Sequence, residues 1–168
     1  MRHIHCRVIF FIALVAFASL TQAEEPAPAV PADPVMKVVY HADFADPRRF
    51  SAMLTSINNM VNTYQEALAE YDIRIVFVSH GIRFVTTDAL KGTAFAEDAL
   101  LRTRRKDLIE RLRTLNTTQG VKLELCGITR EQTRLDPQKL IAGVELVPSG
   151  VVRIAELQQR GFAYLKIE

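Results

Sequence analysis

The amino-acid sequence predicts a three-layer α/β/α fold, in which helices cover both faces of a mainly parallel five-stranded sheet. Short apolar runs typical of strands alternate along the chain with longer segments of helical periodicity. The run "IRIVFV" has five apolar residues among six, as expected for a strand buried on both faces. Alternation of strands and helices favours a parallel sheet, because right-handed crossovers place the connecting helices on its faces.

The first 23 residues are expected to be a signal peptide and not part of this fold. Arg2 and Arg7 lie in a short basic region, and the apolar run 8–20 has 13 residues, whereas a membrane-spanning helix needs about 20. The small residues of "TQA" follow the run. We therefore expect cleavage after Ala23 and a periplasmic location. The next segment, 24–34, has four prolines among eleven residues and is expected to be an extended leader before a folded domain of residues 35–168.

Cleavage after Ala23 also changes the charge and the thiol content of the chain. It leaves 19 of the 21 basic residues against 19 acidic ones, so the mature protein is close to neutral. Neutrality argues against a nucleic-acid partner and against a partner membrane of anionic lipids, and we expect no stable membrane insertion after cleavage. Cys6 leaves with the signal peptide, so Cys126 has no partner for an intramolecular disulfide.

The first half of the domain is predicted to contain two strands and two long helices. "VMKVVYH" is a strand, and Asp46 caps a helix that begins at Pro47 and runs to about residue 70. The second strand begins at Ile73 and ends in a Ser-His-Gly turn at 79–81. An irregular section from 82 to 95 carries apolar residues, namely Phe84, Val85 and Phe95, that we expect to favour self-association. A helix to about residue 118 follows, and its basic residues are interpreted as a solvated face.

The second half is predicted to contain three strands and one helix. "VKLELC" is the third strand, and a polar section at 127–139 has a turn or short helix near "DPQKL". "GVELV" is the fourth strand. Ser149 is the expected N-cap of a helix over 150–159, and Gly161 ends that helix before the final strand "FAYLKI".

Residues with useful chemistry follow the strands of this predicted sheet. His41, His80, Cys126 and the turn 148–150 follow the first four strands in turn. The carboxyl ends of parallel strands meet at one edge of a sheet, which is where ligands bind in such folds. We therefore expect these residues to lie along one edge.

Cys126 is the predicted catalytic residue, with His41, His80, Arg130 and Ser149 as supporting residues. Backbone N–H groups at the start of a following helix favour thiolate, and Arg130 or Arg134 adds positive charge. Such settings lower the pKa of a cysteine from about 8.5. We expect an accessible nucleophile at neutral pH. The alternative is that Cys126 fills the end of a buried strand as a small apolar residue and does not react.

Other chemistries have less support in the sequence. A cysteine–histidine hydrolase would need an orienting third group and an oxyanion site, and the sequence marks neither. His41 and His80 have the alternative role of capping or turn residues. Two histidines and one cysteine over 86 positions lack the ligand spacing of a zinc site, so no metal is expected. The glycine-rich motifs that bind dinucleotides or nucleoside triphosphates are missing from the sequence, and no cofactor is expected.

Four segments, "KVVYHADFADPRRF", "DIRIVFVSHG", "GVKLELCGIT" and "IAGVELVPSGVVRIAELQQRGFAYLKIE", together resemble the DsrE/DsrF-like family of sulfur-oxidation and sulfur-relay proteins. The resemblance implies a flavodoxin-like fold without flavin, association into trimers or hexamers, and transfer of sulfane sulfur between proteins. In sulfur-relay members a cysteine at this junction carries a persulfide, and Cys126 is the residue that matches it. His41 and His80 match positions often seen in an exported subgroup.

The resulting functional prediction is an exported sulfur carrier, or sulfurtransferase-type relay protein, that uses one cysteine persulfide. Its partners would be a sulfur donor, a sulfur acceptor and further copies of the same chain. Persulfide transfer needs one thiolate and no second cysteine. The alternative is a non-catalytic module that binds a small ligand or serves as an oligomeric scaffold.

Overall fold

The computed structural model describes residues 34–168. The predicted signal peptide and nearly all of the predicted leader lie outside the described residues. From residue 34 onward, no helix is both long and apolar enough to cross a membrane.

Five parallel strands form one sheet, as predicted. They are β1 (Met36–Ala42), β2 (Tyr71–Phe77), β3 (Lys122–Cys126), β4 (Val144–Val147) and β5 (Ala163–Leu165). Their order across the sheet is β4-β3-β2-β1-β5, and every neighbouring pair runs parallel. The first three crossovers therefore step in one direction, and the last one returns from β4 across the whole sheet to β5.

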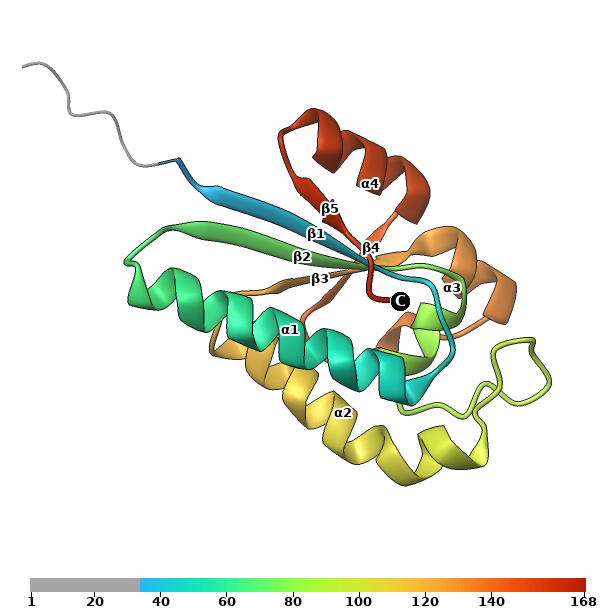
Figure 1. Cartoon of the computed structure of the whole chain (residues 1–168). Coiled ribbons are helices and arrows are strands. Elements are labelled where there is room, and N and C mark those ends of the chain that lie inside the picture. The colour runs from blue at the N-terminus through green and yellow to red at the C-terminus, as the bar shows by residue number, and fades with distance from the viewer. Residues whose placement is uncertain (1–33) are drawn as a thin grey trace, which may run out of the picture. The chain divides into compact units, whose positions relative to one another are not determined.

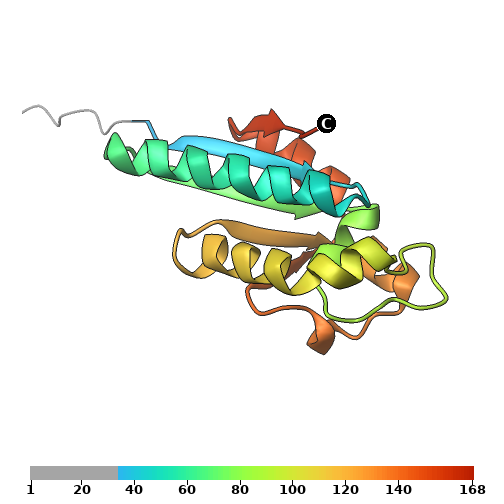
Figure 2. The same ribbon diagram turned by 60° about the horizontal axis from the view of Figure 1, so that its bottom comes forward.

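Helices cover both faces of this sheet (Figures 1 and 2). Two long helices lie on one face, and a third helix, which follows β4, lies on the other. Right-handed crossovers that step in opposite directions place their helices on opposite faces, which accounts for this division. The helices are α1 (Pro47–Glu66), α2 (Ala99–Thr117), α3 (Gly127–Thr133) and α4 (Gly150–Gln159), with two 3₁₀ segments, η1 (Ser79–Phe84) and η2 (Pro137–Lys139).

The ends of the helices follow the local sequence. At the start of α1, the Asp46 carboxylate accepts a hydrogen bond of 2.8 Å from the Arg48 N–H, and Pro47 occupies the first turn, as predicted. The helix ends at Glu66, before the predicted boundary near residue 70, because Leu68 adopts a left-handed φ of 53°. The bounds of α4 agree with the prediction, and Ser149 precedes it as N-cap, although its side chain makes no capping hydrogen bond.

The strands β1 and β2 contribute alternate residues to two apolar cores on opposite faces of the sheet. The larger core lies between the sheet and α1 with α2, and it includes Leu123 and Leu125 of β3. The smaller core lies under α4 and contains Val39, Val76, Ile154, Leu157 and Phe162. Because side chains alternate along a strand, Glu124 and Cys126 lie on the α4 face of β3. Thus the thiol belongs to the face that only α4 covers.

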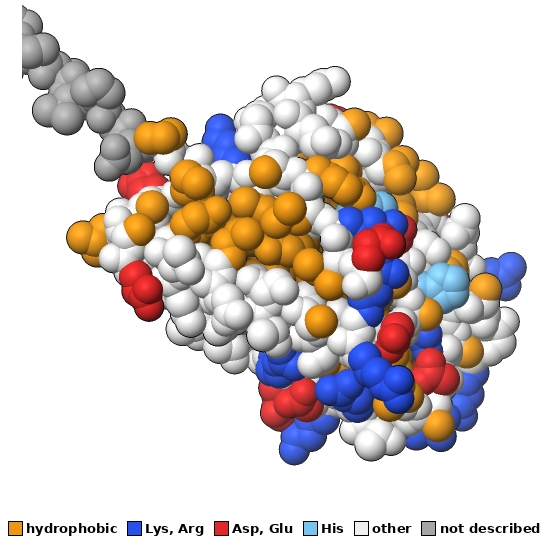
Figure 3. Space-filling view, in the orientation of Figure 1, with side chains coloured by type: hydrophobic (Ala, Val, Ile, Leu, Met, Phe, Trp, Pro, Cys, Tyr) orange, Lys and Arg blue, Asp and Glu red, His pale blue; other side chains and the backbone are white. Residues whose placement is uncertain are grey.

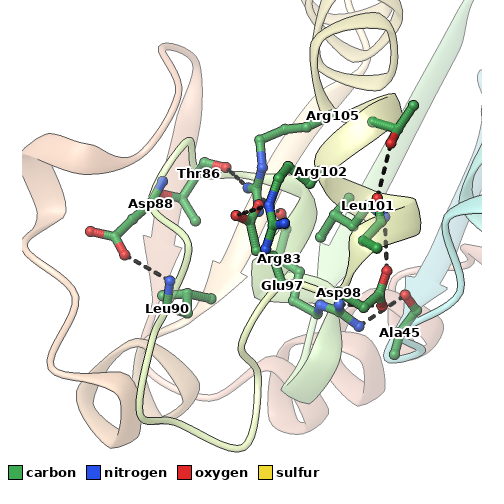
Figure 4. A network of polar contacts seen from close by, with 12 residues as sticks. Ala45, Arg83, Thr86, Asp88, Leu90, Glu97, Asp98, Leu101, Arg102 and Arg105 are labelled. Atoms are coloured by element: carbon green, nitrogen blue, oxygen red, sulfur yellow. Dashed lines mark hydrogen bonds and ion pairs between the residues drawn. The ribbon is translucent and has the colours of Figure 1, made fainter.

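The section between η1 and α2 is irregular, as predicted, but it is fixed by arginine side chains (Figure 4). Arg105 donates to the carbonyl oxygens of Arg83 and Thr86 and forms a 2.9 Å ion pair with Glu97. Arg83 joins Asp98 at 2.6 Å and the Ala45 carbonyl oxygen at 3.1 Å. Arg105 is therefore a tether of this segment, and the interpretation of it as part of a solvated face was wrong.

The apolar residues of this section are also covered within the chain. Phe84 stacks on Phe50, with ring centroids 4.0 Å apart, and is 1 % exposed, while Val85 is fully buried. Phe95 is half-buried and packs edge-on against His80. Phe84 and Val85 therefore offer no exposed apolar surface, whereas Phe95 remains partly exposed.

Candidate functional site

Cys126 ends β3 and occupies the N-cap position of α3. It pairs in register with Val147, the last residue of β4, and the chain turns from there into α4. The start of α3 and the start of α4 therefore meet at the thiol. The residue is 4 % exposed in the single chain. This burial differs from the predicted accessible thiol, and its cause is the close packing of α4 over the end of β3.

Gly150, the first residue of α4, makes this close packing feasible. A Cβ atom at this position would lie 3.0 Å from the Cys126 Cβ and 2.6 Å from a methyl carbon of Val78. A Cβ atom at 2.6 Å from another carbon is not tolerated without movement of one of the two. Only glycine therefore lets the backbone of α4 approach the thiol this closely.

Hydrogen bonding outweighs burial in setting the pKa of Cys126. Burial alone acts to raise the pKa of the thiol. The thiolate is stabilised by the backbone N–H groups of Gly150, Thr129 and Ile128 and by the hydroxyl of Thr129. The net effect places the pKa below its ordinary value. Cys126 makes no regular side-chain capping bond. The donors come from the first turns of two helices, where N–H groups have no partner within the helix.

Thr129 is a site residue that the sequence analysis missed. It is 4 % exposed, and its Oγ1 accepts the Ser79 N–H at 3.0 Å. With that acceptor role taken by Ser79, the hydroxyl hydrogen remains to be donated to the sulfur of Cys126. The one available signal was a threonine three positions after the cysteine, which is the N3 position of a helix capped by Cys126.

A buried ion cluster lies next to the thiol on the same face of β3. The Glu124 carboxylate is 1 % exposed and accepts three hydrogen bonds, one of 2.8 Å from Arg74 and two of 2.7 and 2.8 Å from Arg153. Burial acts to raise the pKa of Glu124, but the bonds from Arg153 and Arg74 outweigh it and hold the pKa below its ordinary value. The sequence analysis did not identify Glu124 or Arg153.

His41 lies on the same face of the sheet but away from the thiol. Its Nδ1 is 2.9 Å from the Tyr164 hydroxyl, and its Nε2 is 3.9 Å from Asp43. Burial lowers the pKa of His41, although Asp43 acts in the opposite direction. Because β2 lies between β1 and β3, the strands of His41 and Cys126 are about 10 Å apart. His41 therefore does not contact Cys126.

The other predicted supporting residues bond to neighbours other than the sulfur. His80 Nδ1 is 3.3 Å from the Ser79 hydroxyl. Arg130 donates to the Leu135 carbonyl oxygen at 3.4 Å and pairs with Glu131 at 3.3 Å, so it fixes the end of α3. Ser149 precedes Gly150 at the start of α4. The structure thus brings the turn 148–150 to Cys126, while the two histidines and Arg130 make their contacts elsewhere.

A groove lies beside the thiol between β4 and α4. It has a volume of about 270 Å³ and is lined by Val147, Pro148, Ser149, Val152, Arg153 and Glu156. Cys126 is not among the lining residues, so the sulfur does not open into it. Within the described part of the chain, no three side chains of the metal-binding types are grouped so that they could hold a metal ion.

Comparison with known families identifies the group to which this chain belongs. The model of the DsrE/DsrF-like family matches residues 33–167, which is most of the chain. The chain belongs to the DsrE/DsrF-like family. The resemblance inferred from the four sequence segments is thereby confirmed. A comparison with curated proteins gives no match.

Two solved structures share the fold of this DsrE/DsrF-like protein. A protein of unknown function, MTH1491 from Methanobacterium thermoautotrophicum, is 24 % identical with a TM-score of 0.57, over 78 % of this chain and 98 % of its own. The ychN protein from E. coli is 20 % identical with a TM-score of 0.50, over 79 % of this chain and all of its own. At these identities the likeness establishes the shared fold.

Proposed function

We propose that this protein is a sulfur carrier, or sulfurtransferase-type relay protein, in which Cys126 holds one sulfane sulfur as a persulfide. The observation that carries the proposal is the position of the sulfur between the first turns of α3 and α4, where backbone N–H groups stabilise an anion. Membership of the DsrE/DsrF-like family supports sulfur relay at the level of the family.

The transfer reaction uses only thiolate and persulfide chemistry. The Cys126 thiolate attacks the outer sulfur of a donor persulfide, a new S–S bond forms, and the donor's S–S bond breaks to release the donor as a thiolate. The transferred sulfur keeps its proton. In the second step, an acceptor thiolate attacks the outer sulfur, and Cys126 leaves as a thiolate. Each step exchanges one S–S bond for another, so no external oxidant or reductant is needed.

The N–H groups around the sulfur favour both steps. They increase the fraction of thiolate that can attack at neutral pH, and they stabilise the same thiolate when it leaves. Because Cys126 is 4 % exposed, the proposal also requires that the residues over the sulfur move when a donor approaches.

Mass spectrometry of the intact protein tests this function. After exposure to a small-molecule persulfide, the protein should gain the mass of one sulfur atom, and Cys126→Ser should gain none. If the protein that contains Cys126 gains no mass, the carrier function is contradicted. The burial of Cys126 favours a second function, a non-catalytic module that binds a small ligand or serves as a scaffold, and a failure to gain sulfur would support it.

Export is proposed on the N-terminal sequence. The run 8–20 followed by "TQA" favours cleavage after Ala23 and a place among exported proteins of the periplasm. N-terminal sequencing of the protein from the periplasmic fraction should give Glu24 as the first residue. Recovery of a chain that still begins at Met1 would contradict this proposal.

Self-association into a trimer or hexamer is proposed on exposed apolar side chains. Val151 and Val152 at the start of α4 are 60 % and 53 % exposed. Figure 3 shows apolar atoms gathered where β1 and the adjoining side of α1 lie, and Met36 of β1 is 39 % exposed. Contiguous apolar surface favours contact with another chain. Light scattering at micromolar concentration should report a multiple of the monomer mass, and a monomer would argue against this proposal.

A further inference from the structure

Helix α4 is joined to β3 at two neighbouring points. At the first, Gly150 packs against Cys126. At the second, Arg153 binds Glu124 through two hydrogen bonds of 2.7 and 2.8 Å. Glu124 and Cys126 are two positions apart on one face of the strand, and Gly150 and Arg153 are three positions apart on one side of the helix. The two contacts therefore depend on the same placement of the first turn of α4.

The strand side of this connection is fixed. Glu124 is 1 % exposed, and its carboxylate is also held by Arg74, which in turn makes bonds of 3.0 and 2.7 Å to Asp72. Two N–H groups of one guanidinium bound to one carboxylate define both distance and orientation. Arg153 therefore has one geometry in which it can satisfy Glu124, and that geometry also places Gly150 over the sulfur.

We propose that the Glu124–Arg153 ion pair is a positioning device for Cys126, which holds the first turn of α4 so that the Gly150 amide faces the sulfur. The biological role of this device rests on the proposed function. The ionisation of the Cys126 thiol, however, can be measured whether or not a persulfide forms. Glu124 and Arg153 are positioning residues, since neither contacts the sulfur in the way that the N–H groups do.

The ionisation of the thiol can be followed by the ultraviolet absorbance of the thiolate as a function of pH. Subtraction of the same titration of Cys126→Ser removes the contribution of tyrosines, and the measurement does not require that a reagent reach the sulfur. In Arg153→Met, which loses both bonds to Glu124, the midpoint should rise by about half a pH unit, as expected when a helix-terminus interaction weakens.

Two further variants separate position from charge. The charged groups of this cluster are Asp72 and Arg74 on β2, Lys122 and Glu124 on β3, and Arg153 and Glu156 on α4. Glu124→Met removes a negative charge, and this loss alone would lower the midpoint of the thiolate titration. Displacement of the first turn of α4 would instead raise that midpoint. Arg153→Lys keeps the positive charge but cannot form the same paired bonds. Arg153→Lys should raise the midpoint of the thiolate titration. This variant provides the test if Glu124→Met does not fold.

Glu156→Gln is the matched control. It removes the exposed partner of Arg153 at 3.7 Å and leaves Glu124 untouched, so the midpoint should stay that of the unmodified protein. A thiolate midpoint in Arg153→Lys that equals that of the unmodified protein would overturn the proposal. A lower urea midpoint of unfolding in the same variant would then show that the ion pair has a purely structural role. A lack of sulfur uptake by the unmodified protein would instead refute the carrier function and leave these titrations valid.

Discussion

Gly150 lies where a strand end, a helix start and a buried thiol meet. Its contacts with Cys126 and Val78 leave no room for a side chain, and its N–H is among the groups that stabilise the thiolate. Thr129 has a comparable role on the side of α3, where its hydroxyl joins the Ser79 N–H to the sulfur. The chemistry of one cysteine is thus set by residues that are not themselves reactive.

Gly150→Ala is expected to weaken both the fold and the acidity of the thiol. The new Cβ would lie 2.6 Å from a methyl carbon of Val78, so α4 must move outward, at a cost of about 1–3 kcal/mol in the free energy of unfolding. The Gly150 N–H then lies farther from the sulfur, and the pKa of Cys126 rises. Urea unfolding and the thiolate titration measure the two effects.

Gln158→Ala is the control for this variant. It changes an exposed residue of the same helix and should leave both quantities nearly unchanged. An alanine at position 150 that left the thiolate midpoint unaltered would show that the approach of α4 does not determine the ionisation of Cys126.

At the scale of elements, the sequence analysis succeeded where an apolar run, a helical repeat or capping residues mark the element. The five strands were predicted from short apolar runs, α1 and α2 from apolar residues at helical spacing, and α4 from Ser149 before it and Gly161 after it. A helix start was expected after Cys126, but the extent of α3 was not predicted, because only Thr129 among its seven residues is buried. Its place depends on the bond from Ser79 to Thr129, which joins residues 50 positions apart.

The candidate site was predicted in the same partial way. The position of Cys126 beside the turn 148–150 followed from the parallel sheet, since strand ends share an edge. The partners of Glu124 could not be predicted, because an isolated acidic residue in a strand does not indicate which arginine binds it. Nor did the sequence reveal that the apolar surface of Phe84 and Val85 is covered within the chain.

Arg105→Met should release the segment between η1 and α2. Arg105 joins the carbonyl oxygens of Arg83 and Thr86 to Glu97, so its loss leaves two half-buried carbonyl groups without this donor. We expect a loss of about 1–3 kcal/mol in the free energy of unfolding, together with faster amide hydrogen exchange at residues 85–98. Lys106→Met, the exposed neighbour on α2, is the control and should change neither. If amide hydrogen exchange at residues 85–98 is equally fast in both variants, Arg105 does not tether this segment.

On the scale of the whole molecule, several carboxylates are paired in the folded state. Arg74 and Lys122 bind Asp72 and Arg153 binds Glu124; these bonds outweigh burial and hold both carboxyl pKa values below their ordinary values. Asp98 also has a lowered pKa, through its bond from the Leu101 N–H and then through Arg83. In each case the unfolded chain takes up protons at a higher pH than the folded chain does.

Stability should therefore fall with decreasing pH. The contribution of each paired carboxylate is complete well above its unfolded pKa and is lost as the pH falls through the folded pKa, so the urea midpoint should decline from about pH 5 downward. His41 acts in the same direction at higher pH, because burial lowers its pKa and its protonation disfavours the fold. Asp72→Asn should flatten the decline. A urea midpoint that stays constant between about pH 7 and pH 4 would contradict the pairing.

The return crossover from β4 to β5 makes the surroundings of the thiol depend on the opposite edge of the sheet. The amide that faces the sulfur comes from Gly150, 24 positions after Cys126, and α4 is followed by β5, which pairs with the first strand, β1. A chain in which α4 has not docked carries a thiol without the Gly150 donor. Once β5 has paired with β1, α4 is held at both ends, and Gly150 lies against Cys126. The surroundings of the cysteine are therefore complete only when strands at both edges of the sheet have formed.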